Sequence, residues 1–332
     1  MDTLLLIFAS TLLIVVGVTP AARWASLRWG ILDHPSARKV HNIPIPRLGG
    51  VAMVGAVLAA LLVFNDRFGM NQLVSILLGA AWVSLLGAWD DQRSLRPVYK
   101  LLGQGVAAAI LIVSGVQVHL WPSEWMDWLV TVVWVVGMTN AVNFIDNMDG
   151  LCGGITAVAS AFFMLMAAQS GQYLVGGLSA ALLGASVGFL RYNFNPATIF
   201  MGDTGSLFLG FLLAALGIKL RFPGNAVVVT WMVPVLVLGV PIFDTTLVVI
   251  SRLRRGTHPA TAGKDHTSHR LVRMGFTTRE AVMALYLAGG ALGMIAVFVT
   301  QASPTEAYLV GAAVLIVAAY SVWRLERVSL DG

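Results

Sequence analysis

Long apolar segments occupy most of this 332-residue chain and constrain its fold more than any other feature. Hydrophobic residues make up 58% of the sequence and charged residues only 11%, whereas a soluble globular domain carries about 25% charged residues. A helix needs about 17 to 25 predominantly apolar residues to cross a bilayer, and such runs recur along the whole chain. The sequence therefore predicts an all-α, polytopic integral membrane protein.

Eleven apolar runs can be drawn, and we expect each of them to form a transmembrane helix. Their approximate bounds are 3–19, 49–64, 72–89, 101–116, 128–142, 152–168, 172–190, 204–220, 226–250, 281–299 and 306–323. The longest polar segments, 20–48 and 251–280, are too short to bury a core of their own. Residues 1–332 are therefore predicted to form a single transmembrane domain, with a basic, histidine-containing loop at 251–280.

The Lys and Arg residues, which were not used to draw the runs, indicate the orientation. With the N-terminus outside, eighteen of the 21 fall in inner segments, and only Arg67, Lys219 and Arg221 fall outside. Because cationic residues concentrate in cytoplasmic loops, we expect an outside N-terminus and a cytoplasmic C-terminus. The basic residues follow the first apolar run instead of preceding it, so we expect a retained span there and not a secretory signal. The net charge of +5 then reflects topology, and no nucleic-acid partner is implied.

Acidic residues interrupt the apolar pattern at three places, all on the same predicted membrane face. Asp90 and Asp91 lie in GAWDDQRSLRPVYK, Asp146 and Asp149 in TNAVNFIDNMDG, and Asp203 in FNPATIFMGDTGS. Carboxylates so close to hydrocarbon are costly unless they are paired, hydrated or bound to a metal. One face of the membrane is therefore predicted to carry an acidic site that uses a cation.

Each of these segments also has a simpler interpretation. The first, with Lys100 nearby, is also compatible with a hydrated helix end and a lysine that snorkels to the interface. In the second, Asn140 and Asn143 would share a helix face with Asn147, and such oxygen ligands suit Mg²⁺, but asparagines also bridge helices. The third reads as a helix start that could bind a phosphate, or as an ordinary Asp or Thr cap.

The basic loop contributes a fourth polar segment. His266, His269 and Arg270 lie in GKDHTSHRL, a combination able to neutralise a diphosphate through charge-assisted hydrogen bonds. A zinc site and a plain solvated loop are the alternatives, although zinc lacks an obvious third ligand. Just before the loop, Pro234 and Pro241 interrupt an apolar run, and such breaks usually line a cavity or groove. The single cysteine excludes an internal disulfide.

Taken in order, these motifs resemble the polyprenyl-phosphate N-acetylhexosamine-1-phosphate transferase superfamily. The resemblance rests on Asp90-Asp91, NAVNFIDNMDG at 140–150, FMGDTGS at 200–206 and the histidine loop, and it extends from about residue 40 to 275. Eleven spans fit the undecaprenyl-phosphate GlcNAc-1-phosphate transferase branch, which is related to the peptidoglycan lipid I translocase. The loop has DHTSHR where the translocase branch has consecutive histidines, and this departure leaves the sugar open.

The resemblance implies a membrane enzyme, a phosphoglycosyltransferase, in one catalytic domain. It would transfer a sugar 1-phosphate from a UDP-N-acetylhexosamine to undecaprenyl phosphate at the cytoplasmic face of the bacterial inner membrane, releasing UMP. This step would start a cell-envelope glycan such as lipopolysaccharide or teichoic acid. UDP-GlcNAc is the first choice of donor, with UDP-MurNAc-pentapeptide or another UDP-amino sugar as alternatives. Mg²⁺, with Mn²⁺ as a substitute, is the implied cofactor.

The resemblance also assigns roles residue by residue. Lys100 would bind phosphate, Asn143 and Asp203 would hold the metal, and Asp90 and Asp91 form an acidic pair whose division of labour is open. The remaining expected substrate-binding residues are Asn140, Asp146, Asp149, Asn193, His266, His269 and Arg270. Transfer could be direct or pass through an aspartyl-phosphate, and a homodimer is compatible with the sequence. A cation-coupled transporter is the remote alternative, disfavoured because transporter sites lie near the bilayer midplane.

Overall fold

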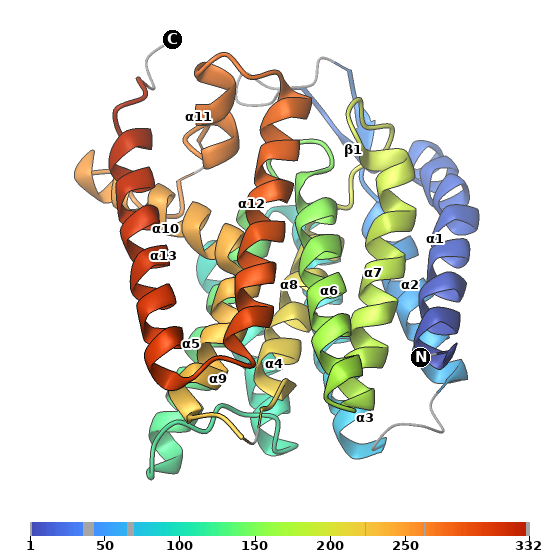
Figure 1. Cartoon of the computed structure of the whole chain (residues 1–332). Helices are drawn as coiled ribbons and strands as arrows, with labels where there is room; N and C mark the ends of the chain where they lie inside the picture. The colour runs from blue at the N-terminus through green and yellow to red at the C-terminus, as the bar shows by residue number, and fades with distance from the viewer. Residues whose placement is uncertain (1, 36–42, 65–69, 223, 262, 330–332) are drawn as a thin grey trace.

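The computed structural model describes residues 2–35, 43–64, 70–222, 224–261 and 263–329. Arg38, Lys39 and Arg67, which enter the topology prediction, lie outside these ranges. The described chain forms a bundle of long helices with a small cap of loops at one end (Figure 1). Its helices are α1 (Asp2–Trp29), α2 (Gly49–Val63), α3 (Met70–Arg93), α4 (Pro97–Val113), α5 (Glu124–Phe144), α6 (Leu151–Gln169), α7 (Tyr173–Asn193), α8 (Gly202–Lys219), α9 (Val227–Val237), α10 (Gly239–Arg254), α11 (Thr267–Arg273), α12 (Thr278–Val299) and α13 (Pro304–Leu325).

Each predicted apolar run is helical over most of its length. Within the described residues, eight helices are long and apolar enough to cross a membrane, or nine if α9 and α10, which meet at a 77° bend, count as one span. The helices α2 and α4 have only 15 and 17 residues, short for a hydrocarbon core of about 30 Å at 1.5 Å per residue. The polytopic membrane fold is confirmed, while the count of eleven spans stays a prediction.

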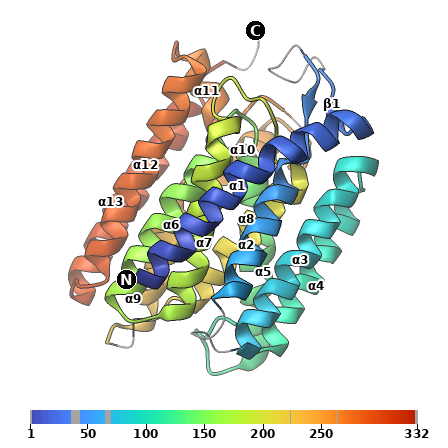
Figure 2. The same cartoon turned by 90° about the vertical axis from the view of Figure 1, so that its right-hand side faces the viewer.

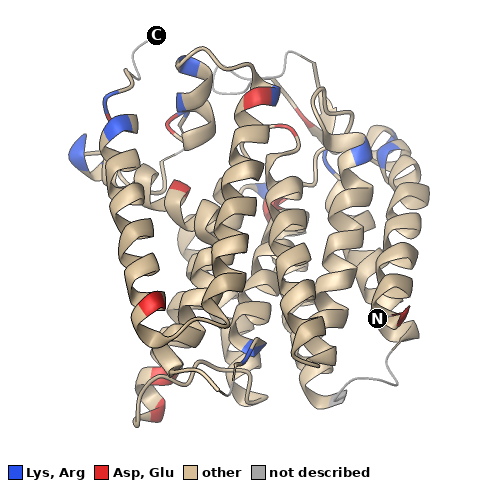
Figure 3. Ribbon diagram, viewed as in Figure 1, with Lys and Arg blue, Asp and Glu red and all other residues tan. Residues whose placement is uncertain are grey.

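The two ends of the bundle differ in charge. The start of α1 and the end of α13 lie at opposite ends of the bundle (Figure 1), as an odd number of crossings requires. Figure 3 shows most of the Lys and Arg residues gathered at the end where α11 lies. This charge asymmetry agrees with the positive-inside argument, which still leaves the orientation of the chain in a membrane as a prediction.

Helix α8 is the buried centre of the bundle (Figure 2). In its membrane-length window 89% of the residues are buried, and α2, α3 and α5 pack around it. Glycines let these neighbours approach closely. A Cβ atom on Gly50 of α2 would lie 2.3 Å from the backbone nitrogen of Gly205, and one on Gly87 of α3 would lie 2.3 Å from the carbonyl oxygen of Asp203. Such close approach of small residues drives helix packing in lipid, and here it fixes the start of α8 against α2 and α3.

A proline in α1 is accommodated by its neighbour α7. Pro20 has no N–H to donate to the carbonyl of Val16, four residues earlier. The Tyr192 hydroxyl on α7 donates to that carbonyl at 2.7 Å. Neighbouring helices commonly satisfy backbone groups freed by proline in this way. Helix α1 therefore continues to Trp29, ten residues beyond the predicted run.

One departure from the predicted all-α fold is a small hairpin-like sheet. Strand β1 (Leu32–Asp33) pairs antiparallel with β2 (Ile45–Pro46). The backbone N–H of Phe200, just before α8, donates to the carbonyl of Pro46 at 2.8 Å. Two-residue strands leave no alternating pattern in a sequence, so hydropathy could not reveal them. The pair fastens the segment between α1 and α2 onto the start of α8.

Substituting Gly50 by alanine tests the importance of this packing. We expect Gly50→Ala to destabilise the protein by about 1 to 3 kcal/mol, the usual cost of overpacking. Gly55→Ala on the same helix is the matched control, because a Cβ there meets nothing within 4 Å. Thermal unfolding in detergent should show a lower midpoint for the first variant only. Equal midpoints would contradict the packing account.

Candidate active site

The ammonium group of Lys100 is surrounded by oxygen atoms from three other helices. Lys100 on α4 forms ion pairs with Asp90 of α3, at 3.0 Å, and with Asp203 of α8. The side-chain oxygen of Asn143 on α5 accepts from the same nitrogen at 3.4 Å. Four helices thus converge on one cation, and the predicted catalytic residues Asp90, Lys100 and Asp203 are brought together with Asn143.

Asn143 is held in a fixed orientation. Its amide nitrogen donates to Asp203 at 3.2 Å and to the hydroxyl of Ser206, one turn along α8, at 2.7 Å. These two bonds leave the amide oxygen facing Lys100. Sequence reasoning did not single out the role of Ser206, although it belongs to the FMGDTGS motif.

Asp91 has a different environment from its neighbour Asp90. One carboxylate oxygen of Asp91 accepts from the backbone N–H of Asp203 at 2.9 Å, and the other accepts from the backbone N–H of Thr204 at 3.0 Å and its hydroxyl at 2.7 Å. The N-cap residue of α8, Met201, provides no side-chain cap. Asp91 of α3 therefore supplies an anion to two N–H groups at this helix start, those of Asp203 and Thr204, while phosphate binding there stays a prediction.

A pocket of about 560 Å³ opens beside this cluster. Its walls come from the segment before α2, the turn between α5 and α6, the loop before α8 and the loop around α11. The predicted residues that line it are Asn143, Asp146, Asp149, Asn193, Asp203 and His269. These segments are far apart in the sequence, and their convergence at one end of the bundle defines the candidate active site.

The α5–α6 turn contributes two carboxylates with different surroundings. Burial, followed by the negative charge of Asp203, raises the pKa of Asp146 to about 7. Asp146 therefore holds a proton part of the time at neutral pH and is able to donate a hydrogen bond into the pocket. Asp149 instead accepts from the side chain of Asn195 at 3.1 Å and the backbone N–H of Ala197 at 2.9 Å, so it also braces the loop before α8.

Two predicted asparagines are engaged with the protein. Asn193 accepts from the N–H of Gly150 at 3.1 Å and donates to the carbonyl of Ile199 at 3.0 Å while still lining the pocket. Asn140 exchanges side-chain hydrogen bonds with Gln104 of α4 and is not among the residues that line the pocket. Bridging of two helices, the simpler interpretation, describes Asn140.

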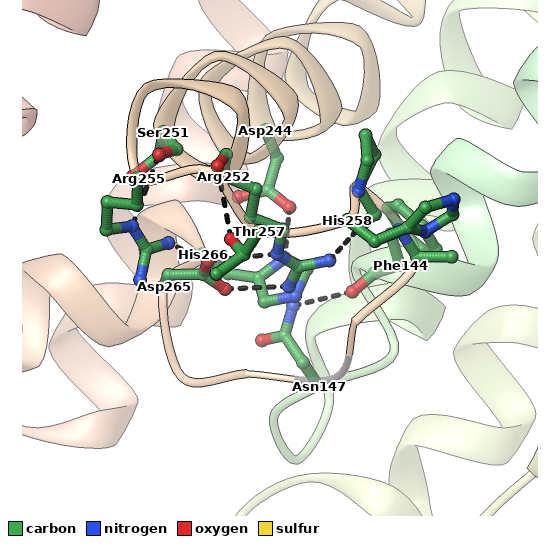
Figure 4. A network of polar contacts seen from close by, with 12 residues as sticks. Phe144, Asn147, Asp244, Ser251, Arg252, Arg255, Thr257, His258, Asp265 and His266 are labelled. Atoms are coloured by element: carbon green, nitrogen blue, oxygen red, sulfur yellow. Dashed lines mark hydrogen bonds and ion pairs between the residues drawn. The ribbon is translucent and has the colours of Figure 1, made fainter.

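The histidine loop is fastened to the site by α11. The Nδ1 atom of His266 lies 2.7 Å from the carboxylate of Asp244 on α10, which also accepts from the N–H of Thr267 at 2.6 Å. The Ser268 hydroxyl donates to Asn147 of the α5–α6 turn at 2.6 Å. Figure 4 shows Asn147, His266 and Asp244 in one polar network with Arg252, Arg255 and Asp265. These bonds place the loop over one side of the pocket.

A buried carboxylate holds the base of the loop. Asp265 receives hydrogen bonds from Arg252, at 2.7 and 3.0 Å, and from Arg255, at 2.6 Å (Figure 4). Burial by itself raises the pKa of this carboxyl, but the hydrogen bonds and charges of Arg252, followed by the hydrogen bond from Arg255, outweigh it and lower the pKa to about 2. Asp265 is therefore ionised at every physiological pH, and its single negative charge is shared by the two arginines.

Arg270 lies inside this packing instead of in the pocket. Its guanidinium donates to the Ser251 hydroxyl at 2.7 Å and to Glu326 at 2.8 Å. It also donates to the carbonyl groups of Asp265 and Leu325, and its side chain is 1% exposed. Arg270 therefore joins the loop to the end of α13, and its position does not support the predicted role in substrate binding.

His269 is the histidine that faces the pocket. Burial, and then the nearby His266, lowers its pKa to about 4, so the ring is neutral at pH 7. Its Nδ1 atom is buried without a hydrogen-bond partner in the described part of the chain. Leaving this buried atom without a partner carries a free-energy cost.

Arg47 is a second residue of this site, after Ser206, that the sequence prediction did not single out. Arg47, from the segment before α2, lines the pocket and forms ion pairs with Asp91 at 2.9 Å and with Asp33 of β1 at 3.3 Å. In the sequence Arg47 is one of several basic residues that were counted only for topology. The one available signal is its place two residues before the Gly49-Gly50 pair, which packs against α8.

Sequence comparison shows which family this chain resembles. Residues 73–221, which contain Asp90, Lys100, Asn143 and Asp203, match glycosyl transferase family 4. A Bacillus subtilis protein named probable undecaprenyl-phosphate N-acetylglucosaminyl 1-phosphate transferase is 34% identical over 89% of this chain and 85% of its own length. The decaprenyl-phosphate N-acetylglucosaminephosphotransferase of Mycolicibacterium smegmatis is 30% identical over 96% and 90%.

A relative from the peptidoglycan branch matches a shorter stretch. The phospho-N-acetylmuramoyl-pentapeptide-transferase of Lacticaseibacillus paracasei is 32% identical over 53% of this chain and 61% of its own length. The Bacillus and Mycolicibacterium relatives match most of the chain at 30% identity or more, which is enough to assign it to their family. The chain belongs to glycosyl transferase family 4, and the resemblance drawn from its motifs is confirmed.

The hydrogen bonds of Asp265 with Arg252 and Arg255, which tether the base of the loop, lead to a testable prediction. A carboxyl whose pKa is lowered on folding stabilises the fold above its unfolded pKa of about 3.9, and this contribution is lost as the pH falls toward 2. At pH 8 the tether should be complete, and Asp265→Asn should free Arg252 and Arg255. Trypsin should then cleave the loop severalfold faster than in the wild type.

Glu124→Gln, an exposed change on α5 at the opposite end of the bundle, serves as the control and should leave cleavage unchanged. Equal cleavage rates for Asp265→Asn and the wild type would show that Asp265 does not hold the loop.

Proposed function

We propose that this protein transfers N-acetylglucosamine 1-phosphate from UDP-GlcNAc to undecaprenyl phosphate and releases UMP. The observation that carries the proposal is the Lys100 ammonium set among oxygens of Asp90, Asn143 and Asp203 at the edge of the pocket. Relatives that match most of the chain are named for this transfer to undecaprenyl or decaprenyl phosphate. The product would start a cell-envelope glycan such as lipopolysaccharide or teichoic acid.

The residues present fit a magnesium ion by their chemistry. Asp203 and Asn143 offer carboxylate and amide oxygens, the hard ligands that Mg²⁺ prefers, and Mn²⁺ shares this preference. Within the described residues, no group of three His, Cys, Asp or Glu side chains could hold a metal alone. Mg²⁺ commonly uses one or two protein carboxylates and completes its shell with water and substrate phosphates. When bound, the ion would neutralise charge on the diphosphate.

The protein's own contribution is positioning and charge. An oxygen of the lipid phosphate attacks the β-phosphorus of UDP-GlcNAc, forming a new P–O bond. The bond from the β-phosphorus to the oxygen it shares with the α-phosphorus breaks, and UMP leaves with the electron pair. A phosphate monoester has a second pKa near 6, so much of the nucleophile is already a dianion at pH 7. Lys100 then stabilises the negative charge that develops during transfer.

The pocket walls would recognise the donor. Asp146 and Asp149 on the α5–α6 turn, with Asn193, lie where the nucleotide would meet polar side chains. The neutral His269 faces the same space and is suited to the sugar or the diphosphate. His266, held by Asp244, keeps α11 in place and so supports the binding of the sugar indirectly.

An activity assay tests the proposal directly. Purified protein given undecaprenyl phosphate, Mg²⁺ and UDP-GlcNAc should release UMP. Asp203→Ala should lower the rate by at least about 100-fold, since removing one electrostatic contact to a transition state costs about 10²- to 10³-fold. The exposed Glu124→Gln variant, far from the pocket, should keep the wild-type rate.

Three results would oppose the proposal. UMP release from UDP-MurNAc-pentapeptide alone would assign the chain to the peptidoglycan branch. Release without undecaprenyl phosphate would point to a covalent enzyme intermediate or to hydrolysis. If no UDP-amino sugar led to release of UMP, the proposed transferase activity would be refuted.

We propose further that the pocket faces the cytoplasm from the bacterial inner membrane. The gathering of Lys and Arg at the pocket end supports this orientation (Figure 3). The single cysteine, Cys152, is buried, so an introduced cysteine can be labelled selectively. In intact cells made permeable only at the outer membrane, an impermeant maleimide should label Gln301→Cys, between α12 and α13, and spare Thr261→Cys in the loop. The reverse pattern would invert the topology.

A further inference from the structure

The two adjacent aspartates of α3 differ in what they contact. Asp90 meets Lys100 at 3.0 Å and the backbone N–H of Leu95 at 2.5 Å. Asp91 meets four donors, three of them on Asp203 and Thr204 and the fourth on Arg47. The side chain of Asp91 is 4% exposed, compared with 16% for Asp90. Only Asp90 is therefore placed beside the cation of the candidate active site.

The contacts of Asp91 fix the position of the first turn of α8. The first backbone N–H groups of a helix have no partner within the helix, and the helix dipole favours an anion near them. The Asp91 carboxylate satisfies two of these groups, those of Asp203 and Thr204. Because the Asp203 side chain projects from this same turn toward Lys100, the bond from Asp91 to the Asp203 N–H sets where the Asp203 carboxylate lies.

The backbone of α8 is shaped to receive this carboxylate. Gly202 has a φ of +66°, and a Cβ atom there would lie 2.5 Å from an oxygen of Asp91. A side chain at position 202 would therefore both strain the backbone and displace Asp91. The absence of a side chain at Gly202 and its positive φ therefore both favour the contact between Asp91 of α3 and the start of α8.

Arg47 connects the same carboxylate to the small sheet. One guanidinium nitrogen of Arg47 lies 2.9 Å from Asp91, and the other lies 3.3 Å from Asp33 of β1. A planar guanidinium is able to span two carboxylates at once, whereas a lysine ammonium acts as a single point charge. Arg47 also compensates the charge of a carboxylate that is almost fully buried, which would otherwise be costly.

We infer that Asp91 is a positioning residue that holds Asp203 through the first turn of α8, and that Arg47 is its counter-ion and couples this turn to the β1–β2 segment. Asp90 is the member of the acidic pair that faces the reacting groups. The inference rests on the proposed function for its effect on activity, but the contact network itself is a property of the fold.

Two variants and their double mutant test the assignment in the UMP-release assay. A misplacement of about 1 Å in a catalytic group can cost about 100-fold in rate, so Asp91→Asn should lower kcat by about 10- to 100-fold. The shape of its pH–rate profile should stay that of the wild type, since a positioning residue transfers no proton in the reaction. Arg47→Gln should lower kcat by a similar factor, and Arg47→Lys should recover only part of it.

Comparison of the double variant with the single variants measures the coupling between Asp91 and Arg47 and is the sharper test. If Arg47 acts through Asp91, the double variant should lose no more rate than Asp91→Asn alone, because interacting groups are non-additive. The exposed Arg93→Gln change at the end of α3 is the control and should keep the wild-type rate. Multiplicative losses in the double variant would overturn the assignment of Arg47. Loss of the acidic limb of the pH–rate profile in Asp91→Asn would make Asp91 a catalytic acid or base.

Amide hydrogen exchange provides a readout that needs no turnover. Exchange across residues 200–206 should accelerate in both Asp91→Asn and Arg47→Gln, because the N–H groups of Asp203 and Thr204 lose their acceptor or its orientation. Unchanged exchange in both variants would refute the positioning role even if the protein proved inactive with every UDP-sugar. If the proposed function were wrong, the wild type would release no UMP. The faster amide exchange of the two variants at residues 200–206 would still be observed.

Discussion

The structure depends on the neutralisation of several carboxylates that meet at the start of one buried helix. Asp90, Asp91 and Asp203 come from α3 and α8, and their mutual repulsion in a low-dielectric setting would be severe. Two cations compensate part of this negative charge. Lys100 forms ion pairs with Asp90 and Asp203, and Arg47 forms one with Asp91. The two cations come from different segments, so the site exists only when α4 and the segment before α2 are both in place.

This division separates two tasks within one acidic cluster. The Lys100 side opens to the pocket and has groups that a diphosphate and a metal ion can share. On the Arg47 side the carboxylate of Asp91 is almost fully buried, and its contacts fix the first turn of α8. The proposed acceptor is a flexible lipid, so most of the positioning must come from the protein, and both tasks are needed. The loop that carries α11 completes the enclosure through Asp244, Asp265 and Arg270, whose contacts are internal.

Hydrophobic pattern predicted the helices well because crossing a bilayer leaves the backbone few choices. The four motifs also located the site, since acidic residues in apolar surroundings are informative. The sequence did not reveal which aspartate of the adjacent pair faces Lys100, because that choice depends on how α3 is rotated against α8. In the sequence, Arg47 was counted only as one of the basic residues that indicate topology, because its role depends on a tertiary contact with Asp91. Arg270 was expected to bind substrate, but its tertiary contact with Glu326 holds it away from the pocket.

In the proposed reaction, Asp203 and Asn143 would hold a divalent cation against a nucleotide diphosphate. The most direct measurement is paramagnetic broadening of the ³¹P signals of UDP-GlcNAc by Mn²⁺ bound to the purified protein, compared between the wild type and Asp203→Ala. We expect strong protein-dependent broadening of both phosphorus signals in the wild type and its loss in the variant. Equal broadening in the two proteins would contradict it.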